Sequence, residues 1–300
     1  MILSLKRNIK WIKILKKNKG KLLETKVLGK KMYIDISKVK YDIGEESIAK
    51  QLALDGIREP VSTVYFRKYI KDCEVFLDIG ANIGYYTLIA AEEMKKDGII
   101  YAVEPSDENI ELLKKNIFAN GYGKMVKIHK LAFSDKKGEV NYFVSSMSNL
   151  NTTYNSELVH KKQVPFLKRY KVKSTTVDKF LEDNKKPEFI KMDIEGAEVD
   201  VIKGMKKTLR AKKKIILFIE IHPQLLTDTS LMQDLLRTLK KNGFRIKVAV
   251  SHDDFYRNAV DITRIENISI DELIRDRRIV DGTTAFEVFF EKSPHNSTEN

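Results

Sequence analysis

The chain has 300 residues, of which 42% are hydrophobic, so it can bury an ordinary core and wholesale disorder is not expected. Its 55 Lys and Arg residues outnumber its 42 Asp and Glu residues, and the net charge of +13 suits nucleic acid, an anionic membrane, an acidic substrate or a solvated lysine-rich surface. The single cysteine, Cys73, excludes an internal disulfide and a cysteine-based zinc site and fits a cytoplasmic protein, and no run of about 18 apolar residues could span a bilayer.

The first twenty residues predict a basic amphipathic helix. Apolar residues recur at helical spacing from Ile2 to Leu15, Trp11 lies near this stripe, and lysines fill much of the remaining surface. The lysines interrupt every candidate apolar core, so a secretory signal is a poor match. Two interpretations remain: a helix on an anionic membrane surface, which would make the protein peripheral to the membrane, or a helix packed on its own domain. We assign this helix to an N-terminal extension over residues 1–69.

Residues 70–292 alternate strand and helix patterns, which predicts a doubly wound, Rossmann-like α/β domain with a seven-stranded, mostly parallel sheet. The expected strands cover residues 75–79, 99–104, 126–131, 188–193, 215–221, 244–250 and 285–290. An insertion at about 139–176 holds two further expected strands, at 139–145 and 170–176. The tail, residues 293–300, is expected to be frayed.

The segment that follows the first strand of this domain is a candidate cofactor loop. It begins at Asp78, passes Gly80 and Asn82, and opens a helix at Gly84 and Tyr85, so that backbone can approach a ligand closely. A dinucleotide fingerprint has glycine where Asp78 stands, because a carboxylate would repel pyrophosphate. Asp78 instead suits a ligand with a cationic amino group and a sulfonium, and we expect all five residues to contact such a cofactor. A tight turn without a ligand is the alternative.

Two further acids extend the expected cofactor site. Glu104 ends the second strand, 24 residues after Gly80, which is close to the spacing of about 20 for an acid that binds ribose hydroxyls. Asp135 follows the third strand and is placed to accept a hydrogen bond from an adenine amino group. The alternatives are a solvated strand-end acid for Glu104 and ordinary turn chemistry for Asp135.

Acids and a histidine follow the next two strands. Asp193 and Glu195 end the fourth strand, and Glu220 and His222 end the fifth. Because ligands of open parallel sheets bind outside the carboxyl ends of the strands, we expect these four side chains to converge beside the cofactor. A solvated charged rim is the alternative, although Asp193 and Glu220 adjoin runs too apolar for such a rim.

Taken in chain order, these segments resemble the FkbM family of methyltransferases. The segments that match are Phe76–Thr87, Val103–Pro105, Ala132–Asp135, Ile190–Glu198 and Glu220–His222. The resemblance covers roughly residues 70–225, and the ordered set is more specific than any single segment. It implies a class I methyltransferase fold, S-adenosylmethionine as the methyl donor, and a hydroxyl acceptor, often on a sugar, glycan or natural product. The segment Gly56–Pro60 more weakly resembles archaeal members, and the N-terminal helix lies outside the resemblance.

His222 is the candidate base for such a reaction. An alcohol stays protonated at neutral pH, histidine titrates near neutrality, and Glu220 or Glu195 could orient the ring. We expect no metal. The alternative is that Asp193, Glu195, Glu220 and His222 bind a hard divalent cation that lowers the pKa of the acceptor hydroxyl.

Two rival functions remain open at the level of sequence. An RNA methyltransferase would suit the positive charge, but the segment after the fourth strand lacks the Asn/Asp-Pro-Pro-aromatic signature of amino-group methylation, and several carboxylates near the site disfavour a phosphate-rich substrate. A membrane-peripheral protein with an inactive cofactor domain is the second rival, although packing alone does not require acids at four strand ends. We expect acceptor specificity to lie in residues 146–169 and in the N-terminal segment.

Overall fold

An eight-stranded sheet forms the centre of the domain, with the strand order β12-β11-β13-β10-β9-β3-β4-β5. The computed structural model describes residues 2–18, 22–37, 48–145, 151–154, 166–253 and 262–293. The strands of this sheet are β3 (Val75–Ile79), β4 (Ile99–Val103), β5 (Val126–His129), β9 (Phe189–Met192), β10 (Ile215–Ile221), β11 (Arg245–Asp253), β12 (Ile262–Glu266) and β13 (Phe286–Lys292). The predicted doubly wound α/β fold and its seven strands are confirmed, and β12 is an addition that the sequence pattern does not predict.

The direction of the strands places the expected site at one edge of the sheet. Strands β5, β4, β3, β9 and β10 pair in parallel, whereas β13 lies antiparallel between β10 and β11, and β12 pairs antiparallel with β11. The carboxyl ends of β3, β4, β9 and β10 therefore lie side by side. This is the edge at which open α/β sheets bind their ligands.

Helices cover both faces because successive strand residues point to opposite sides. In β3, Phe76 packs in the apolar cluster with α3 (Pro60–Ile70), α4 (Tyr85–Glu93) and α5 (Asp107–Ala119). The next residue, Leu77, packs in the cluster on the opposite face. The helices of that face are α7 (Val177–Phe180), α8 (Glu198–Lys203), α9 (Lys206–Arg210), α10 (Ser230–Lys241), α11 (Ile270–Arg275) and α12 (Arg277–Val280), and a 3-10 turn, η2 (Pro223–Leu225), follows β10.

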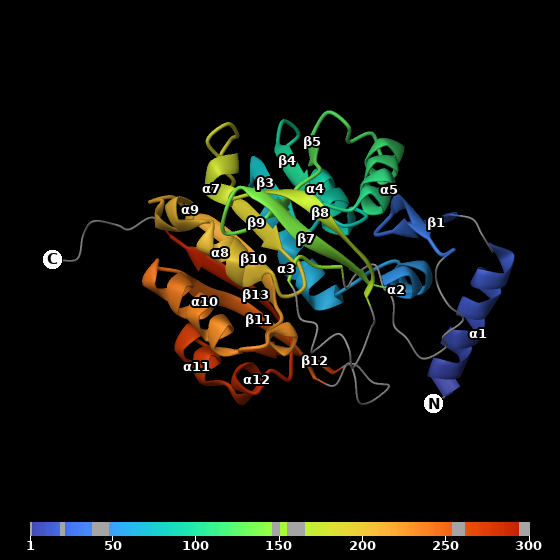
Figure 1. Cartoon of the computed structure of the whole chain (residues 1–300). Helices are drawn as coiled ribbons and strands as arrows, with labels where there is room; N and C mark the ends of the chain where they lie inside the picture. Colours follow the sequence, from blue (N-terminus) through green and yellow to red (C-terminus); the bar gives the residue numbers. More distant parts are fainter. Residues whose placement is uncertain are drawn as a thin grey trace.

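The insertion forms a separate three-stranded sheet of order β6-β8-β7. Its strands are β6 (Ala132–Phe133), β7 (Gly138–Ser145) and β8 (Phe166–Thr175), so both predicted insertion strands are confirmed. In Figure 1, β7 and β8 lie across the front of the central sheet. Most of the segment to which we assign acceptor specificity (146–150 and 155–165) lies outside the described residues, as do residues 294–300 of the tail.

The N-terminal extension contains α1 (Ile2–Lys17), a hairpin of β1 (Leu22–Val27) and β2 (Lys30–Asp35), and α2 (Ile48–Asp55). The sequence pattern predicts the helix but not the hairpin. Asn116 of α5 holds β2: its Oδ1 accepts from the backbone N–H of Tyr33 at 2.7 Å, and its Nδ2 donates to the carbonyl of Tyr33 at 3.2 Å. The extension thus packs on the same face of the sheet as α3–α5.

Helix α1 lies at the end of the molecule opposite α10–α12 (Figure 1). Trp11 and Leu15 are buried in the cluster that also contains residues of α3–α5, and Arg7 forms an ion pair with Asp55 at the end of α2. These contacts support the interpretation of a helix packed on its own domain. Within the part of the chain that the structure describes, no helix combines the length and apolarity needed to cross a membrane.

Candidate functional site

The loop after β3 turns sharply at Gly80, next to the end of β9. Gly80 has a φ angle of +77°, and a Cβ at this position would overlap the backbone carbonyl oxygen of Asp193. Only glycine therefore allows this close approach. The N–H groups of Gly80 and Ala81 both donate to the carbonyl of Val103, at 3.0 Å, so the loop is also fixed to the end of β4. The predicted glycine bend is present and is held from two sides.

Asp78 lies behind this bend. Its buried carboxylate accepts a hydrogen bond from Thr87 Oγ1 at 2.6 Å, and its Oδ1 lies 3.9 Å from the ammonium of Lys191. Burial raises the pKa of Asp78, whereas Lys191 and Thr87 act to lower it. Lys191 Nζ also donates to the carbonyl of Gly80 at 3.2 Å. Asp78 thus positions Lys191 and α4, and it does not line the cavity beside the loop.

Glu104, which directly follows β4, has both carboxylate oxygens bonded to the protein. Oε2 accepts from the backbone N–H of Asn82 at 2.9 Å, and Oε1 accepts from the N–H of Ser106 at 2.9 Å and from Asn109 Nδ2 at 3.3 Å. Burial raises the pKa of Glu104, and these N–H groups oppose that shift. These three bonds use three of the about four acceptor positions of a carboxylate, so Glu104 can also accept one ribose hydroxyl.

A cavity of about 610 Å³, open to solvent, connects the glycine bend with Glu104. Asn82, Asp193 and Glu195 contribute polar groups to its wall. The apolar part of the wall consists of Ile79, Val103, Leu131, Ala132, Phe133 and Ile194. An apolar wall beside an acid that can bind ribose suits the aromatic base of a nucleoside. We call this space the donor cavity.

Besides Asp78, three further predicted cofactor contacts lie outside the donor cavity. Asp135 is exposed, because β6 pairs with β8 in the small sheet and the chain leaves the wall of the cavity after Phe133. Gly84 precedes the first residue of α4 with a φ angle of +96°. Tyr85 lines a second, smaller cavity of about 360 Å³, but its hydroxyl bonds to the backbone of Arg58. Contact of these three residues with the cofactor stays a prediction, and Gly84 and Tyr85 help to shape the loop.

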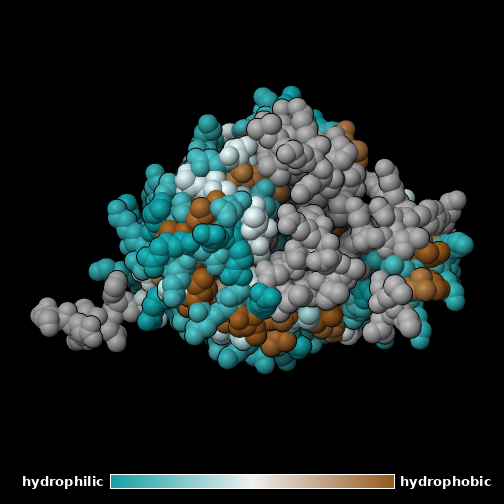
Figure 2. All heavy atoms as spheres, turned by 90° about the horizontal axis from the view of Figure 1, so that it is seen from below, coloured by the Kyte–Doolittle hydropathy of each residue, from teal (hydrophilic) through white to brown (hydrophobic). Residues whose placement is uncertain are grey.

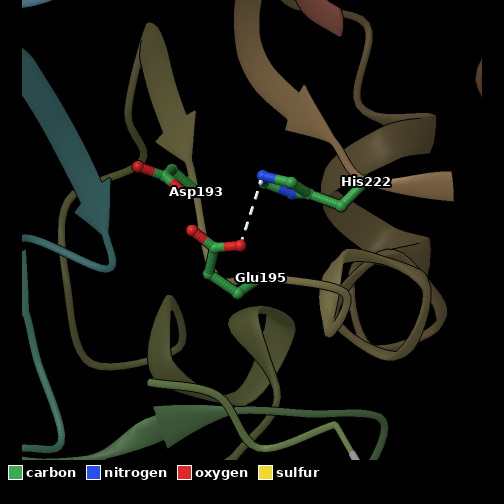
Figure 3. Close-up of side chains that lie close together, drawn as sticks. All are labelled: Asp193, Glu195 and His222. Carbon is green, nitrogen blue, oxygen red and sulfur yellow. Dashed lines mark ion pairs between the residues drawn. The ribbon is translucent and has the colours of Figure 1, made fainter. Parts of the chain in front are cut away.

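The acids and histidine predicted at the ends of β9 and β10 come together, and Figure 3 shows three of them, Asp193, Glu195 and His222. His222 Nε2 lies 3.3 Å from Glu220 Oε1 and 3.5 Å from Glu195 Oε2. Asp193 and Glu195 line the donor cavity, whereas His222 is only 3% exposed and does not line it. Glu195 therefore connects His222 with the cavity.

Glu198 also belongs to this cluster, although its sequence position alone does not indicate it. Its fully buried carboxylate accepts from the N–H groups of Gly196 at 3.1 Å and Ile194 at 3.4 Å, and it lies 3.1 Å from His222 Nδ1. It thereby fixes both the loop after β9 and the orientation of the imidazole. Glu198 is part of the family-like segment Ile190–Glu198, which is the one sequence feature that points to it. We would otherwise expect an acid at the start of a helix to be solvated and to interact with the helix dipole.

The ionisable side chains of this cluster shift each other's pKa values. Burial opposes a charge on His222, yet Glu195 and Glu220 outweigh it, and the pKa of His222 is raised well above its ordinary value. Burial raises the pKa of Glu195 to about 8, although His222 acts to lower it. His222 is therefore charged near neutrality and is a poor proton acceptor. Glu195 has the more suitable pKa for a base and faces the cavity.

The segment before α3 also reaches the site, which the sequence analysis does not anticipate. Arg58 lines both the donor cavity and the smaller cavity, and its Nε forms an ion pair with Glu59. Glu59 accepts a hydrogen bond from the hydroxyl of Tyr86 at 2.6 Å, and burial raises its pKa to about 7. The weak resemblance of the Gly56–Pro60 segment to archaeal family members is the sequence feature that points to this region. Its contact with the cofactor loop cannot be predicted from the sequence, because the two segments are far apart along the chain.

Part of the insertion covers the cavity. Thr152 Oγ1 donates to the carbonyls of Glu195 at 2.8 Å and Ile194 at 3.1 Å, and the backbone of Thr152 pairs with Phe143 of β7. Asn151, Thr152 and Thr153 line the donor cavity. The insertion thus fixes the loop that carries Glu195.

Two groups of side chains could offer ligands to a cation. In the described residues, Asp193, Glu195 and His222 place ligand atoms within 4.8 Å of one another, and Glu59, Glu220 and Glu287 do the same. Both donor sets fit a hard divalent ion in ligand type. However, Lys191 Nζ already lies 3.4 Å from Asp193 Oδ2, and the charged His222 lies between Glu220 and Glu195. Cations of the protein thus already neighbour the first group, and the absence of a metal stays a prediction.

Comparison with known proteins identifies the domain. The sequence profile described as "Methyltransferase FkbM domain" matches residues 78–246. A curated relative, the hexuronic acid methyltransferase AglP of Haloferax volcanii, is 26% identical over 151 residues, which cover 50% of this chain and 56% of the relative. The match thus spans little more than half the length of that relative.

Two solved structures of methyltransferases are distantly similar to this chain. A SAM-dependent O-methyltransferase from Thermotoga maritima is 16% identical, with a TM-score of 0.42, over 95% of this chain and 82% of that one. Methyltransferase FkbM from Methylobacillus flagellatus KT is 14% identical, with a TM-score of 0.41, over 95% of this chain and 59% of that one. On the profile match, the chain belongs to the FkbM family of methyltransferases, and residues 78–246 form its S-adenosylmethionine-dependent methyltransferase domain.

Proposed function

We propose that the protein transfers a methyl group from S-adenosylmethionine to a hydroxyl group of a sugar. The observation that carries this proposal is a single cavity whose wall holds Glu104, suited to a ribose, together with Asp193 and Glu195, suited to a cation and a hydroxyl. The name of the relative from Haloferax volcanii, a hexuronic acid methyltransferase, supports a sugar acceptor.

The donor-binding residues follow from the chemistry of the cavity wall. S-adenosylmethionine, when bound, supplies a methyl group that its sulfonium has already activated. Glu104 would accept a hydrogen bond from a ribose hydroxyl, and the apolar wall around Leu131 and Phe133 would contact the adenine. Asp193 would attract the positive charges of the donor. Holding donor and acceptor in line can account for about 7–11 kcal/mol of the barrier.

We propose Glu195 as the group that accepts the hydroxyl proton. It faces the donor cavity, and burial raises its pKa to about 8, so its basicity is close to that required at neutral pH. His222 would act as a positioning residue, because its imidazole contacts Glu195 at 3.5 Å and is held by Glu198 at 3.1 Å on the other side. Glu220 would share the charge of His222. This arrangement modifies the expectation from sequence that His222 itself is the base.

The acids that surround the cavity also bear on the two rival functions. The carboxylates of Asp193 and Glu220 would repel a phosphate-rich acceptor, so the site suits a sugar hydroxyl better than RNA. The set of acids around the cavity and the glycine bend favour an active enzyme over an inactive cofactor domain.

We further propose that α1 brings the protein to an anionic membrane surface. Leu5 and Ile9 of α1 are 61% and 45% exposed, although Trp11 and Leu15 pack inward. Figure 2 shows hydrophobic residues among hydrophilic ones at the right-hand end of the molecule, where α1 lies in Figure 1. Exposed lysines, including Lys6, Lys10 and Lys13, are close along the helix. Exposed apolar residues beside lysines suit binding to a membrane with anionic headgroups. Binding there would bring the site close to a glycan that is linked to a membrane lipid.

The test of the proposed reaction uses the protein and a donor with an isotopically labelled methyl group. Extracts of the native host, separated into lipid-linked glycans, free sugars and RNA, are incubated with both, and the products are analysed by mass. The proposal predicts label on a sugar oxygen. Label on RNA, or on no fraction although the donor binds, would contradict it.

A further inference from the structure

The donor cavity and the smaller cavity meet at four residues. Both are lined by Arg58, Gly80, Asn82 and Asp193. If the ribose binds at Glu104, the methionine part of the donor extends along the glycine bend toward this junction. The junction is therefore where the amino and carboxylate groups of the donor have to be recognised.

Arg58 is held in place at the junction by residues of two helices. The hydroxyl of Tyr85 donates to the carbonyl of Arg58 at 2.8 Å and accepts from its backbone N–H at 3.1 Å. Thr63 Oγ1 donates to the same carbonyl at 2.8 Å. The Arg58 Nε bonds to Glu59, whose other oxygen accepts from Tyr86. Both the backbone and the inner part of the side chain are thus fixed before any ligand arrives.

The outer part of the guanidinium remains available. Within the described residues, its two terminal nitrogens donate no hydrogen bond, and the side chain is 17% exposed and lines both cavities. Lys191, the other cation at the junction, is already bonded: its Nζ lies 3.2 Å from the carbonyl oxygen of Gly80 and 3.4 Å from Asp193 Oδ2. Arg58 is therefore the cation that can still take an anionic ligand here.

We propose that Arg58 binds the α-carboxylate of the donor's methionine part. Two parallel N–H groups of a guanidinium match the two oxygens of a carboxylate, and Asp193 lies at the same junction to receive the neighbouring ammonium. The residues around Arg58 and α3 thus belong to the donor site, although they precede the matched domain. This inference rests on the proposed placement of the ribose at Glu104.

An acidic sugar acceptor is the other possible partner of Arg58, and a pair of ligands separates the two. Decarboxylated S-adenosylmethionine lacks only the α-carboxylate. Binding of this compound and of S-adenosylmethionine is measured by calorimetry for the wild type, Arg58→Gln and Arg58→Lys. Arg67→Ala is the matched control, because Arg67 belongs to α3 and pairs at the surface with Glu93.

The wild type should bind S-adenosylmethionine about 10- to 100-fold more tightly than the decarboxylated compound. Arg58→Gln should lose this preference by weakening S-adenosylmethionine alone, Arg58→Lys should retain part of it, and Arg67→Ala should retain all of it. If a variant does not fold, the wild-type preference alone decides.

Three results would overturn the proposal: equal wild-type affinity for both ligands, an equal loss of both in Arg58→Gln, or a loss confined to the KM of an acidic acceptor. A wild type that binds neither ligand would instead refute the donor site itself.

Discussion

The backbone N–H of Asn82 donates to the Glu104 carboxylate at 2.9 Å, and this bond joins the glycine bend after β3 to the end of β4. Asn82 has a φ angle of +49°, so its backbone is turned toward Glu104 by a left-handed conformation. Two motifs that are separate in the sequence are thereby parts of one rigid wall. The same wall continues to Asp193 and Glu195, which lets one cavity hold a donor and present its methyl group to an acceptor.

Gly80→Ala should destroy donor binding. The added Cβ would overlap the Asp193 carbonyl, and the residue has a φ angle of +77°. Gly121→Ala is the control, because Gly121 has the same φ angle of +77° but no atom within 4 Å of the added carbon. Backbone strain of about 1 kcal/mol is common to both variants, and the overlap adds about 1–3 kcal/mol at Gly80 alone. Thermal unfolding and calorimetry check this, and donor affinity equal in the two variants would contradict it.

The dependence of rate on pH should identify Glu195 as the base. A base acts when deprotonated, so kcat/KM of the wild type should rise with pH to a plateau above about 8, the pKa to which burial raises Glu195. Glu195→Gln should reduce turnover by about 10²–10⁴-fold and remove the rise. Glu182→Gln, at the surface, should behave as the wild type.

His222→Gln provides the complementary measurement. His222 acts to lower the pKa of Glu195, so its removal should shift the midpoint of the profile to higher pH and reduce turnover by at least about 10²-fold, with donor affinity nearly unchanged. An unshifted midpoint at full activity would mean that His222 has no part in the reaction.

How much the sequence predicts depends on whether a contact is local. The strand and turn patterns locate Gly80, Glu104, Asp193 and Glu195 at the correct edge, because parallel strands bring their carboxyl ends together. They do not give the direction of each side chain. Asp78 therefore points behind the bend, although the motif suggests a ligand contact.

Contacts between distant segments are not encoded in a local pattern. Arg58 meets the cofactor loop only because α3 packs on the same face of the sheet as α4. The hairpin of the extension forms although its sequence has no hydrophobic periodicity that would identify its two strands. Asp135 fails to reach the cavity because pairing of β6 with β8 takes the chain away. The charge of His222 is likewise set by distant residues, because Glu195 and Glu220 outweigh burial and raise its pKa above the ordinary value of a histidine.

Methyl transfer should persist in excess chelator. Lys191 and His222 already lie beside the carboxylates of Asp193, Glu195 and Glu220, and the two positive charges of the donor would add to them. Activity is compared with and without a chelator such as EDTA, followed by addition of Mg²⁺ or Mn²⁺. Loss of activity that either ion restores would establish a metal at Asp193, Glu195 and His222 and overturn this expectation.

Leu5→Glu and Ile9→Glu should each weaken binding to anionic liposomes by at least about 10-fold, because an apolar contact is replaced by a charge that the headgroups repel. Substitution is preferable to deletion of α1, because Trp11 and Leu15 are part of the core. Val280→Glu, in α12 at the other end of the molecule, is the control. Unchanged sedimentation with the liposomes in both α1 variants would refute a membrane role for this face, and methylation of a soluble acceptor should be unaffected.

The most direct test of the donor site is a crystal structure of the protein with S-adenosylhomocysteine. We expect a ribose hydroxyl on the Glu104 carboxylate, the adenine against Leu131 and Phe133, and the sulfur beside the loop that carries Asp193 and Glu195. A ligand bound elsewhere, or a dinucleotide in this cavity, would contradict this expectation.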